Sequence, residues 1–430
     1  MKKRNVAFLH PDLGLGGAER LIVDAALELV SAGHAVDIYT TYHDPQRCFE
    51  ETRGSGGFGV TVAGDWFPRH IAGRFLALCA YIRCILAALY MAWLSFKGKA
   101  QYDAVIVDQV SVVIPFLKHL TRSRVLFYCH FPDMLLAQRR SQLKKLYRIP
   151  LDWVEQTTTG HADLVLVNSA FTQGVFKKTF SRLAERGIVP DVLHPAVPIP
   201  SDGELQEADA TWEAKLDRDL VSFMGGGPML LSINRFERKK GISLAVQALH
   251  EFLIRAPGSL PKVTLVLAGG FDARLPENVQ HLQELKDLVR ELDLHDRVRF
   301  VVSFTDSQRA ALLAACTAVV YTPQFEHFGI VPLEAMAAKK PVIAVNNGGP
   351  VETVAHEETG YLCEPTPAAF ASAFRQLLCV SEDGGTSDAR QMGEAAKARV
   401  QAQFSRAAFG CKLQAHLEAA MKDGGKIRRT

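Results

Sequence analysis

Short apolar runs alternate with stretches of helical periodicity along this 430-residue chain. In the first half, strands are predicted at Val6–His10, Ala35–Thr40, Ala104–Val107, Val125–Tyr128 and Leu164–Val167. In the second half, strands are predicted at Met229–Ile233, Val263–Ala268, Val298–Val302, Ala318–Tyr321 and Pro341–Val345. Apolar runs separated by helices are typical of parallel sheets that are covered on both faces. The pattern therefore predicts an α/β protein with two parallel sheets.

The alternation is interrupted between the two halves. The proline-rich segment His194–Pro200 is followed by the polar, acidic segment Ser201–Asp219 and by the glycines of Gly225–Gly227. We expect a first domain at 1–200, a linker at 201–228, a second domain at 229–400, and a C-terminal helix and tail at 401–430 that pack back on the first domain. Ligands of open parallel sheets bind beyond the carboxyl ends of the strands. Two such domains that face each other would leave a cleft there.

Two glutamates flank a short loop after the predicted strand Ala318–Tyr321, in the sequence Glu326-His-Phe-Gly-Ile-Val-Pro-Leu-Glu334. Pro332 suits the first position of a helix. The free N–H groups of a helix start attract an anion such as a diphosphate. Carboxylates beside them would repel phosphate and are better suited to hydroxyl groups. The loop therefore predicts a ligand that joins phosphate to sugar, although glutamates at this spacing also occur as ordinary surface charges.

A cationic cluster at the equivalent place in an earlier βα unit, the carboxyl end of a strand, strengthens this interpretation. Asn234-Arg-Phe-Glu-Arg-Lys-Lys240 follows the predicted strand Met229–Ile233. Arg235 offers a planar fork for phosphate oxygens, and Lys240 offers a point charge. A solvated charge run is the commoner fate of a lone cluster, but its pairing with the glutamate loop favours a binding site.

The glycine-rich turn after the first predicted strand differs from a dinucleotide fingerprint. With Gly14 and Gly16 as the first two glycines, the pattern requires a third glycine where Glu19 stands. Glycines still let the backbone approach a ligand closely. We expect Gly16 and Gly17 to contact the ligand, and a tight strand-to-helix turn is the alternative.

Composition and charge narrow the class of protein further. The chain is 48% hydrophobic and 22% charged, with a formal charge of +3, which does not indicate a nucleic-acid partner. Its eight cysteines occur singly, without zinc-binding spacing, as expected in a reducing compartment. The apolar run Val6–Leu9 is too short for a secretory signal.

The charge is distributed unevenly along the chain. Arg69–Arg148 contains thirteen Lys or Arg and three acidic residues, a local excess of +10. Inside it, the apolar segment 71–96 has a longest uncharged run of thirteen residues, whereas a membrane span needs about 20. The segment is therefore either a buried helix pair or a helix that dips into a cytoplasmic leaflet. The positive excess favours the membrane, with Leu86, Leu89 and Trp93 as membrane-facing residues.

Several motifs occur in an order that is familiar from known enzymes. They are Gly16–Arg20, Tyr128–Asp133, Val167–Thr172, Asn234–Lys240, Glu326–Glu334 and Gly348–Thr353. Together they resemble the retaining glycosyltransferases of family 4. The sequences of Cys129–Asp133 and Asn234–Lys240 are most similar to those of mannosyltransferases of the dolichol pathway. The resemblance spans essentially the whole chain and implies the GT-B fold, in which two Rossmann-like parallel-sheet domains face each other across a cleft.

The resemblance implies a donor, an acceptor and a location. The donor would be GDP-mannose, and the acceptor a dolichyl-diphosphate-linked chitobiose that carries one mannose. The enzyme would add an α-1,3 and an α-1,6 mannose at the cytosolic face of the endoplasmic reticulum membrane. The membrane surface and other mannosyltransferases of the dolichol pathway would be its partners.

Roles for individual residues follow in part from chemistry and in part from the resemblance. Cations aimed at the charge that develops on a leaving diphosphate lower the barrier, and Arg235 and Lys240 are the candidates. By resemblance, Glu326 holds the sugar hydroxyls, Glu334 holds the ribose, and His130 lies at the sugar's C6 side and the acceptor site. The remaining expected donor-binding residues are Gly16, Gly17, Phe328, Gly329, Ile330 and Val331.

We expect no cofactor and no metal. Asp217-Arg-Asp219 has the form of a metal-binding motif, but it lies in the polar linker, away from the strand ends. A family-4 mannosyltransferase with a different lipid-linked acceptor is one alternative function. A non-catalytic nucleotide-sugar-binding scaffold is another, although the presence of Arg235, Lys240, Glu326 and Glu334 argues against it.

Overall fold

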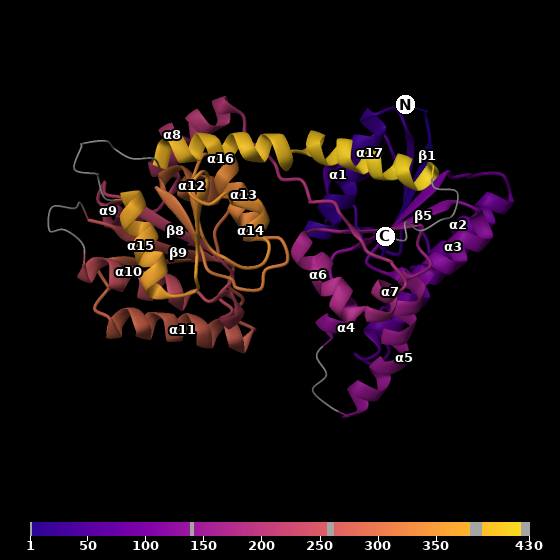
Figure 1. The fold of residues 1–430 in the computed structure, drawn as a ribbon, viewed down its shortest axis with the longest axis horizontal. Helices are drawn as coiled ribbons and strands as arrows, with labels where there is room; N and C mark the ends of the chain where they lie inside the picture. Colours follow the sequence, from indigo (N-terminus) through magenta and orange to yellow (C-terminus); the bar gives the residue numbers. More distant parts are fainter. Residues whose placement is uncertain (1, 138–141, 256–261, 379–388, 423–430) are drawn as a thin grey trace. The chain divides into compact units, whose positions relative to one another are not determined.

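The computed structural model describes residues 2–137, 142–255, 262–378 and 389–422. The chain divides into two compact units. Unit 1 comprises Met1–Ala196 and Arg406–Thr430, and unit 2 comprises Val197–Ser405. Each unit is built around one parallel β-sheet with helices on both faces (Figure 1).

The sheet of unit 1 has seven strands within the described residues, in the order β3-β2-β1-β4-β5-β6-β7. Their bounds are β1 Asn5–His10, β2 Ala35–Thr40, β3 Gly59–Val62, β4 Ala104–Asp108, β5 Arg124–Cys129, β6 Leu164–Val167 and β7 Asp191–Val192. All neighbouring strands are parallel. The strand order reverses at β1, so the carboxyl ends of β1 and β4 flank the place where such sheets bind ligands.

The helices that cover this sheet come mostly from the first half of the chain. They are α1 Gly17–Ser31, α2 Leu76–Phe96, α3 Ile114–Thr121, α4 Asp133–Leu136, α5 Gln142–Thr159, α6 Ala170–Thr179, α7 Ser181–Glu185 and, from the end of the chain, α17 Arg406–Lys422. Helix α17 packs on α1, where Leu413 and Leu417 join the core cluster of Leu21. The Arg406 Nε donates a hydrogen bond to Glu28 Oε1 at 2.8 Å beside this contact.

The sheet of unit 2 has six parallel strands within the described residues, in the order β10-β9-β8-β11-β12-β13. Their bounds are β8 Met229–Ile233, β9 Thr264–Gly269, β10 Val298–Val302, β11 Ala318–Tyr321, β12 Val342–Val345 and β13 Gly360–Cys363. Here the strand order reverses at β8, which lies between β9 and β11.

The helices of unit 2 include the segment that composition marks as a linker. They are α8 Asp202–Lys215, α9 Arg218–Met224, α10 Ser243–Ile254, α11 Pro276–Glu291, α12 Asp306–Ala315, α13 Ile330–Ala337, α14 Pro350–Thr353, α15 Pro367–Leu378 and α16 Ala389–Gln403. Residues 201–228, expected as a linker, contain α8 and α9 and belong to unit 2. A capping box starts α8, with the Ser201 Oγ accepting from the Glu204 N–H.

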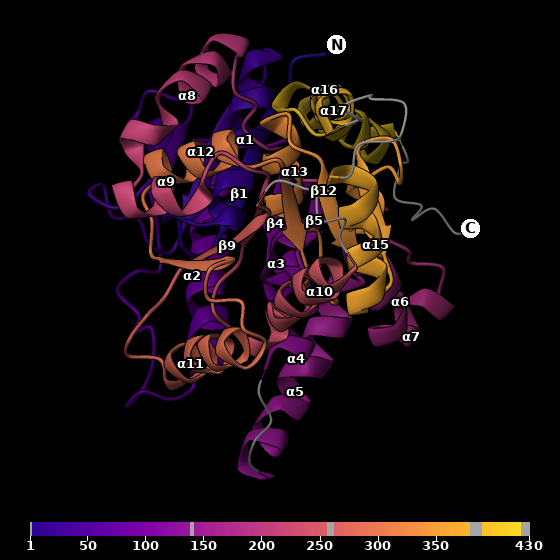
Figure 2. The ribbon, with the colours of Figure 1, turned by 90° about the vertical axis from the view of Figure 1, so that its left-hand side faces the viewer.

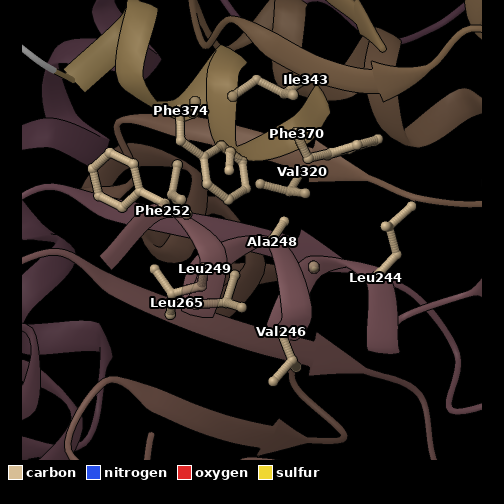
Figure 3. Close-up of a cluster of buried hydrophobic side chains, with 14 of the residues drawn as sticks. Leu244, Val246, Ala248, Leu249, Phe252, Leu265, Val320, Ile343, Phe370 and Phe374 are labelled. Atoms are coloured by element: carbon tan, nitrogen blue, oxygen red, sulfur yellow. The ribbon is translucent and has the colours of Figure 1, made fainter. Parts of the chain in front are cut away.

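Alternate residues of the unit 2 strands belong to different cores. Leu230 and Val320 lie in one cluster, with Phe252, Phe370 and other side chains that Figure 3 shows. The neighbouring residues Leu231 and Val319 lie in the cluster on the opposite face. Successive side chains of a strand point to opposite faces, so the near-continuous apolar runs reflect a sheet that is buried on both sides.

The ten strands predicted from apolar runs are all present, with ends that differ by at most one residue. Three further strands, β3, β7 and β13, were not predicted. Each lies at or next to an edge of its sheet, and β7 has only two residues. Short edge strands lack the long apolar runs on which the prediction depends.

Replacement of Gly393 tests a close approach that fixes α16. A Cβ there would lie 2.1 Å from the Lys339 backbone oxygen at the end of α13. We expect Gly393→Ala to lower the free energy of unfolding by about 1–3 kcal/mol, measured by denaturant titration. Gly203→Ala in α8 is the control, because a Cβ there meets no atom within 4 Å. It should be neutral or slightly stabilising, and equal loss in both variants would contradict the packing argument.

Candidate active site

In unit 2, the loop after β8 and the loop after β11 meet through Lys240 and Glu326. The Lys240 Nζ lies 2.5 Å from the Glu326 Oε2, with the two side chains 15% and 26% exposed. The backbones are joined as well, because the Thr322 hydroxyl donates to the Lys240 carbonyl oxygen at 2.8 Å. Gly241 ends the short Arg238–Lys240 turn with a φ of +59°, a conformation that glycine adopts without strain. The expected proximity of the lysine and the glutamate is therefore present.

The glycine pair Gly348 and Gly349 also holds the Glu326 loop. The Gly349 N–H donates to the Glu326 carbonyl oxygen at 2.9 Å. A Cβ at Gly349 would lie 2.0 Å from the Phe328 carbonyl oxygen, and Gly348 has a φ of +68°. Only glycine fits such an approach of two backbones, so these residues set the position of the loop.

Tyr321, the last residue of β11, supports the Glu326 carboxylate from within the core. Burial raises the pKa of Tyr321, and the charge of Glu326 and a hydrogen bond to it raise the pKa further. The phenol therefore remains neutral and serves as a donor. Glu326 is held between the Lys240 ammonium and the Tyr321 hydroxyl.

Arg235 lies on the same loop as Lys240 but is much more exposed. Its side chain is 64% exposed, and one guanidinium nitrogen lies 3.0 Å from the Glu237 Oε1. Glu237 also pairs with Lys239 at 3.0 Å. An exposed guanidinium with one carboxylate partner can turn towards a ligand phosphate at little cost.

Helix α13 begins two residues before the position expected from Pro332. Gly329 precedes its first residue and has a φ of +80°, so Pro332 is the third residue of the helix instead of the first. The missing N–H of proline is still harmless there, because the first four N–H groups of a helix have no partner within the helix. The helix start at Ile330 and Val331 keeps free donors for an anion.

Phe328, an expected donor contact, belongs to the core of unit 2. It is 4% exposed and packs against Phe404, with ring centroids 6.0 Å apart. Any contact from Phe328 to a ligand must therefore come from its backbone.

Glu334 has a partner outside the Lys240–Glu326 pair. Its carboxylate forms an ion pair with Arg309, in the first turn of α12. Burial lowers the pKa of Arg309, which makes a close carboxylate more important for holding its charge. Glu334 and Arg309 both line a cavity of about 1090 Å³ within unit 2.

Unit 1 has a buried carboxylate between two histidines. Asp108 ends β4, His10 ends the neighbouring strand β1, and His130 directly follows β5. The His10 Nδ1 lies 2.7 Å from one Asp108 oxygen, and the His130 Nε2 lies 2.8 Å from the other. Asp108 and His10 are buried, whereas His130 is 24% exposed. Three adjacent strands thus place these groups at one edge of the sheet.

The two charges stabilise each other. Burial alone would raise the pKa of Asp108, but the charge of His130 and the hydrogen bond from His10 hold it at about 2. Burial alone would lower the pKa of His130, but the charge of Asp108 raises it above the usual value. His130 is therefore biased towards its protonated, cationic form.

The glycine turn of unit 1 lies near His130. Gly16 caps α1 in an extended conformation, and Gly17 is the first residue of the helix. A Cβ at Gly16 would lie 2.2 Å from the Glu19 carboxylate, which folds back over the turn. The charge of Glu19 contributes to the raised pKa of His130, so the turn and the histidine share one environment.

Helix α2 is a core helix of unit 1 with one exposed face. By length and composition it could cross a membrane, but residues along it, among them Cys84, Ala88 and Met91, are buried in unit 1. Leu86 is half-buried, whereas Leu89 and Trp93 are exposed. The Arg83 guanidinium is buried and donates to the Thr41 carbonyl oxygen, which anchors the helix in the unit. One side of α2 is therefore buried in unit 1, and of the three predicted residues only Leu89 and Trp93 are on the exposed side.

The described residues contain no group of three or more His, Cys, Asp or Glu side chains placed to hold a metal ion. Asp217 and Asp219 flank the start of α9.

Four residues of these sites were not predicted: His10, Asp108, Arg309 and Tyr321. His10 and Asp108 had a usable signal, because each is a polar residue at the carboxyl end of an apolar run. Tyr321 was counted as an ordinary strand residue. Arg309 had no distinguishing signal, since a single arginine on a helix is commonly a surface charge.

Two family descriptions match the chain, one in each half. Glycosyltransferase Family 4 matches residues 15–197, and Glycosyl transferases group 1 matches residues 217–399. Among solved structures, sucrose-phosphate synthase from Thermosynechococcus elongatus has a TM-score of 0.68 at 24% identity and covers 97% of this chain and 100% of its own. Anabaena HepE in complex with UDP has a TM-score of 0.67 at 21% identity, over 96% and 100%. The chain is a glycosyltransferase with the GT-B fold.

The named relatives show which family of glycosyltransferases the chain belongs to. The Alpha-1,3/1,6-mannosyltransferase ALG2 of Mus musculus is 49% identical over 95% of this chain and 94% of its own length. The protein of the same name from Homo sapiens is 49% identical over 95% and 94%, and that from Saccharomyces cerevisiae is 40% identical over 97% and 85%. The chain belongs to this alpha-1,3/1,6-mannosyltransferase family.

Removal of the Asp108 charge tests whether that charge raises the pKa of His130. In Asp108→Asn we expect the pKa of His130 to fall, because the charge that raises it is lost, and this can be followed by NMR titration of the imidazole. Transferase activity should fall by roughly 10–100-fold, the equivalent of a hydrogen bond to a charged group. Asp65→Asn, at an exposed position, is the control. An unchanged His130 titration in Asp108→Asn would refute the coupling.

Proposed function

We propose that the chain transfers mannose from GDP-mannose to a lipid-linked oligosaccharide, with retention of the anomeric configuration. The observation that supports this most directly is the pairing of Lys240 with Glu326 beside the start of α13. A cation suited to a diphosphate and a carboxylate suited to sugar hydroxyls lie side by side there. A nucleotide sugar requires this combination.

The chemistry proposed is a transfer on one face of the sugar. The bond between the mannose C1 and the diphosphate oxygen breaks, and a bond between C1 and the acceptor oxygen forms on the same face. The proton of the acceptor hydroxyl passes to the departing diphosphate. Lys240, Arg235 and the N–H groups at the start of α13 stabilise the charge on that group, so no metal and no cofactor are required.

The carboxylates and the histidine position the sugar and its nucleotide. Glu326, held by Lys240 and Tyr321, accepts hydrogen bonds from mannose hydroxyls. Glu334 accepts from the ribose, which requires it to share or leave its contact with Arg309. His130 binds the C6 side of the sugar and the acceptor, and Asp108 fixes the orientation of the His130 imidazole. Fixed positioning of this kind supplies a large part of the rate of group transfer.

The proposed acceptor is a dolichyl-diphosphate-linked chitobiose that carries one mannose. The enzyme would extend it by an α-1,3 mannose and an α-1,6 mannose. The names of the relatives state both linkages. The reaction would take place at the cytosolic face of the endoplasmic reticulum membrane, with other mannosyltransferases of the pathway as candidate partners.

A transfer assay with matched lysine variants tests this function. Purified protein is incubated with GDP-mannose and a synthetic phytanyl-diphosphate trisaccharide, and the products are read by mass. We expect two additions of one hexose each. Lys240→Ala should lower the rate by about 10²–10³-fold, since one donor to a developing charge is worth that much. Lys239→Ala is the control, because Lys239 is an exposed neighbour that pairs with Glu237.

Three outcomes would contradict the proposal. Absence of any transfer while GDP-mannose still binds would favour a non-catalytic scaffold. Equal rates for the Lys240 and Lys239 variants would refute the role of the ammonium. Activity that EDTA abolishes and manganese restores would show that a metal neutralises the diphosphate.

A further inference from the structure

Helix α5 of unit 1 presents an exposed apolar face that no described element covers. Leu146, Ile149 and Trp153 are 67%, 62% and 59% exposed. Their spacing of three and four residues places them on one side of the helix. Figures 1 and 2 both show the first turns of α5 projecting away from the rest of unit 1. We call these three residues the α5 face.

The apolar surface continues onto two neighbouring elements of the unit. Leu135 and Leu136 of α4, which packs against α5, are exposed. Phe75 and Leu76 at the start of α2 are exposed as well. Tyr147 joins α2 to α5, because its ring lies 5.5 Å from that of Phe75 and its hydroxyl accepts from the Leu78 N–H at 3.1 Å. Exposed apolar side chains that gather on elements in contact with one another are typical of interaction sites.

The opposite face of α5 holds the segment that follows His130. The Glu155 carboxylate accepts from the N–H groups of Asp133 and Met134 at 2.7 and 3.0 Å. The Arg148 guanidinium donates to the Asp133 carboxylate at 2.8 Å. Glu155 and Arg148 are both buried. The inner side of α5 therefore fixes the start of α4, three residues after His130.

The charge of this part of the chain favours an anionic occupant. The segment Arg69–Arg148 has an excess of +10, whereas the rest of the chain carries −7. Lys145 lies beside Leu146 and is exposed. An interfacial helix combines apolar and Trp side chains on one face with flanking cations, and anionic lipid attracts each of those cations. A second copy of the chain would place the same positive segment against itself, which is unfavourable.

We propose that the α5 face and its apolar neighbours on α4 and α2 are the surface by which unit 1 binds an anionic lipid bilayer. The surface differs from the one predicted on α2 at Leu86, Leu89 and Trp93. It rests on the proposed function in one respect, namely that the acceptor is lipid-linked. Because the same helix holds the His130 segment, binding brings that segment to the membrane where such an acceptor lies.

Vesicle co-sedimentation tests the surface directly. The full chain is mixed with vesicles of phosphatidylcholine with or without phosphatidylserine. We expect the wild type to sediment with the vesicles that contain phosphatidylserine, and the variant Leu146→Gln, Ile149→Gln, Trp153→Gln to bind at least about tenfold more weakly. The control is Ile254→Gln, Leu275→Gln, Val279→Gln, which changes three exposed apolar residues of unit 2. The control should bind like the wild type.

A water-soluble acceptor separates this inference from the proposed function. With an acceptor that has no lipid chain, the α5 variant should transfer mannose as fast as the wild type, which also shows that it is folded. If neither protein transfers mannose to this acceptor or to the phytanyl-diphosphate trisaccharide, the proposed function fails, and sedimentation still decides the surface.

Several results would overturn the proposed surface. They are unchanged sedimentation of the α5 variant, equal loss in the unit 2 control, and binding that does not depend on phosphatidylserine. Light scattering that finds a dimer of the wild type and a monomer of the α5 variant, with sedimentation unchanged, would identify the face as a contact between copies of the chain.

Discussion

The contact between Lys240 and Glu326 is the interaction on which the proposed site depends. The two residues are 86 positions apart, and they meet because β8 and β11 are adjacent parallel strands whose following loops leave the same edge of the sheet. Both side chains are partly exposed, so the pair adds little to stability. Its importance lies in placement, because the contact keeps the Lys240 ammonium and the Glu326 carboxylate together just before the start of α13. Gly348 and Gly349 help to fix the Glu326 loop, because without side chains they let the backbone of Glu326 and Phe328 pass close to their own.

Unit 1 uses the same edge of its own sheet for a different set of groups. Asp108 is fully buried and would be costly as a lone charge, but a histidine lies within ion-pair distance of each of its oxygens. The result is a histidine that is oriented, partly exposed and biased towards its cation. Parallel sheets bring strand ends from distant parts of the sequence to one edge, which explains why polar residues that follow apolar runs assemble twice in this chain.

Much of the architecture could be predicted from sequence because buried parallel strands are long apolar runs. The strands β6, β8, β10 and β11 have the predicted bounds. Proximity of Lys240 to Glu326 was predictable for the same reason, once both were placed after strands. The partners of Glu334 and His130 were not, because Arg309 and Asp108 become distinctive only when the helix and strand neighbours are known. The orientation of α2 could not be predicted either, since an apolar helix in a core and one on a membrane have the same composition.

The central claim is that Lys240 binds the diphosphate of the donor while Glu326 is reserved for the sugar. Calorimetric titration of GDP, which has the diphosphate but no sugar, into the wild type, Lys240→Met and Glu326→Gln tests it most directly. The account predicts that GDP binds Lys240→Met at least about tenfold more weakly than the wild type, and that Glu326→Gln keeps its affinity for GDP. Equal affinity of the wild type and Lys240→Met would contradict it.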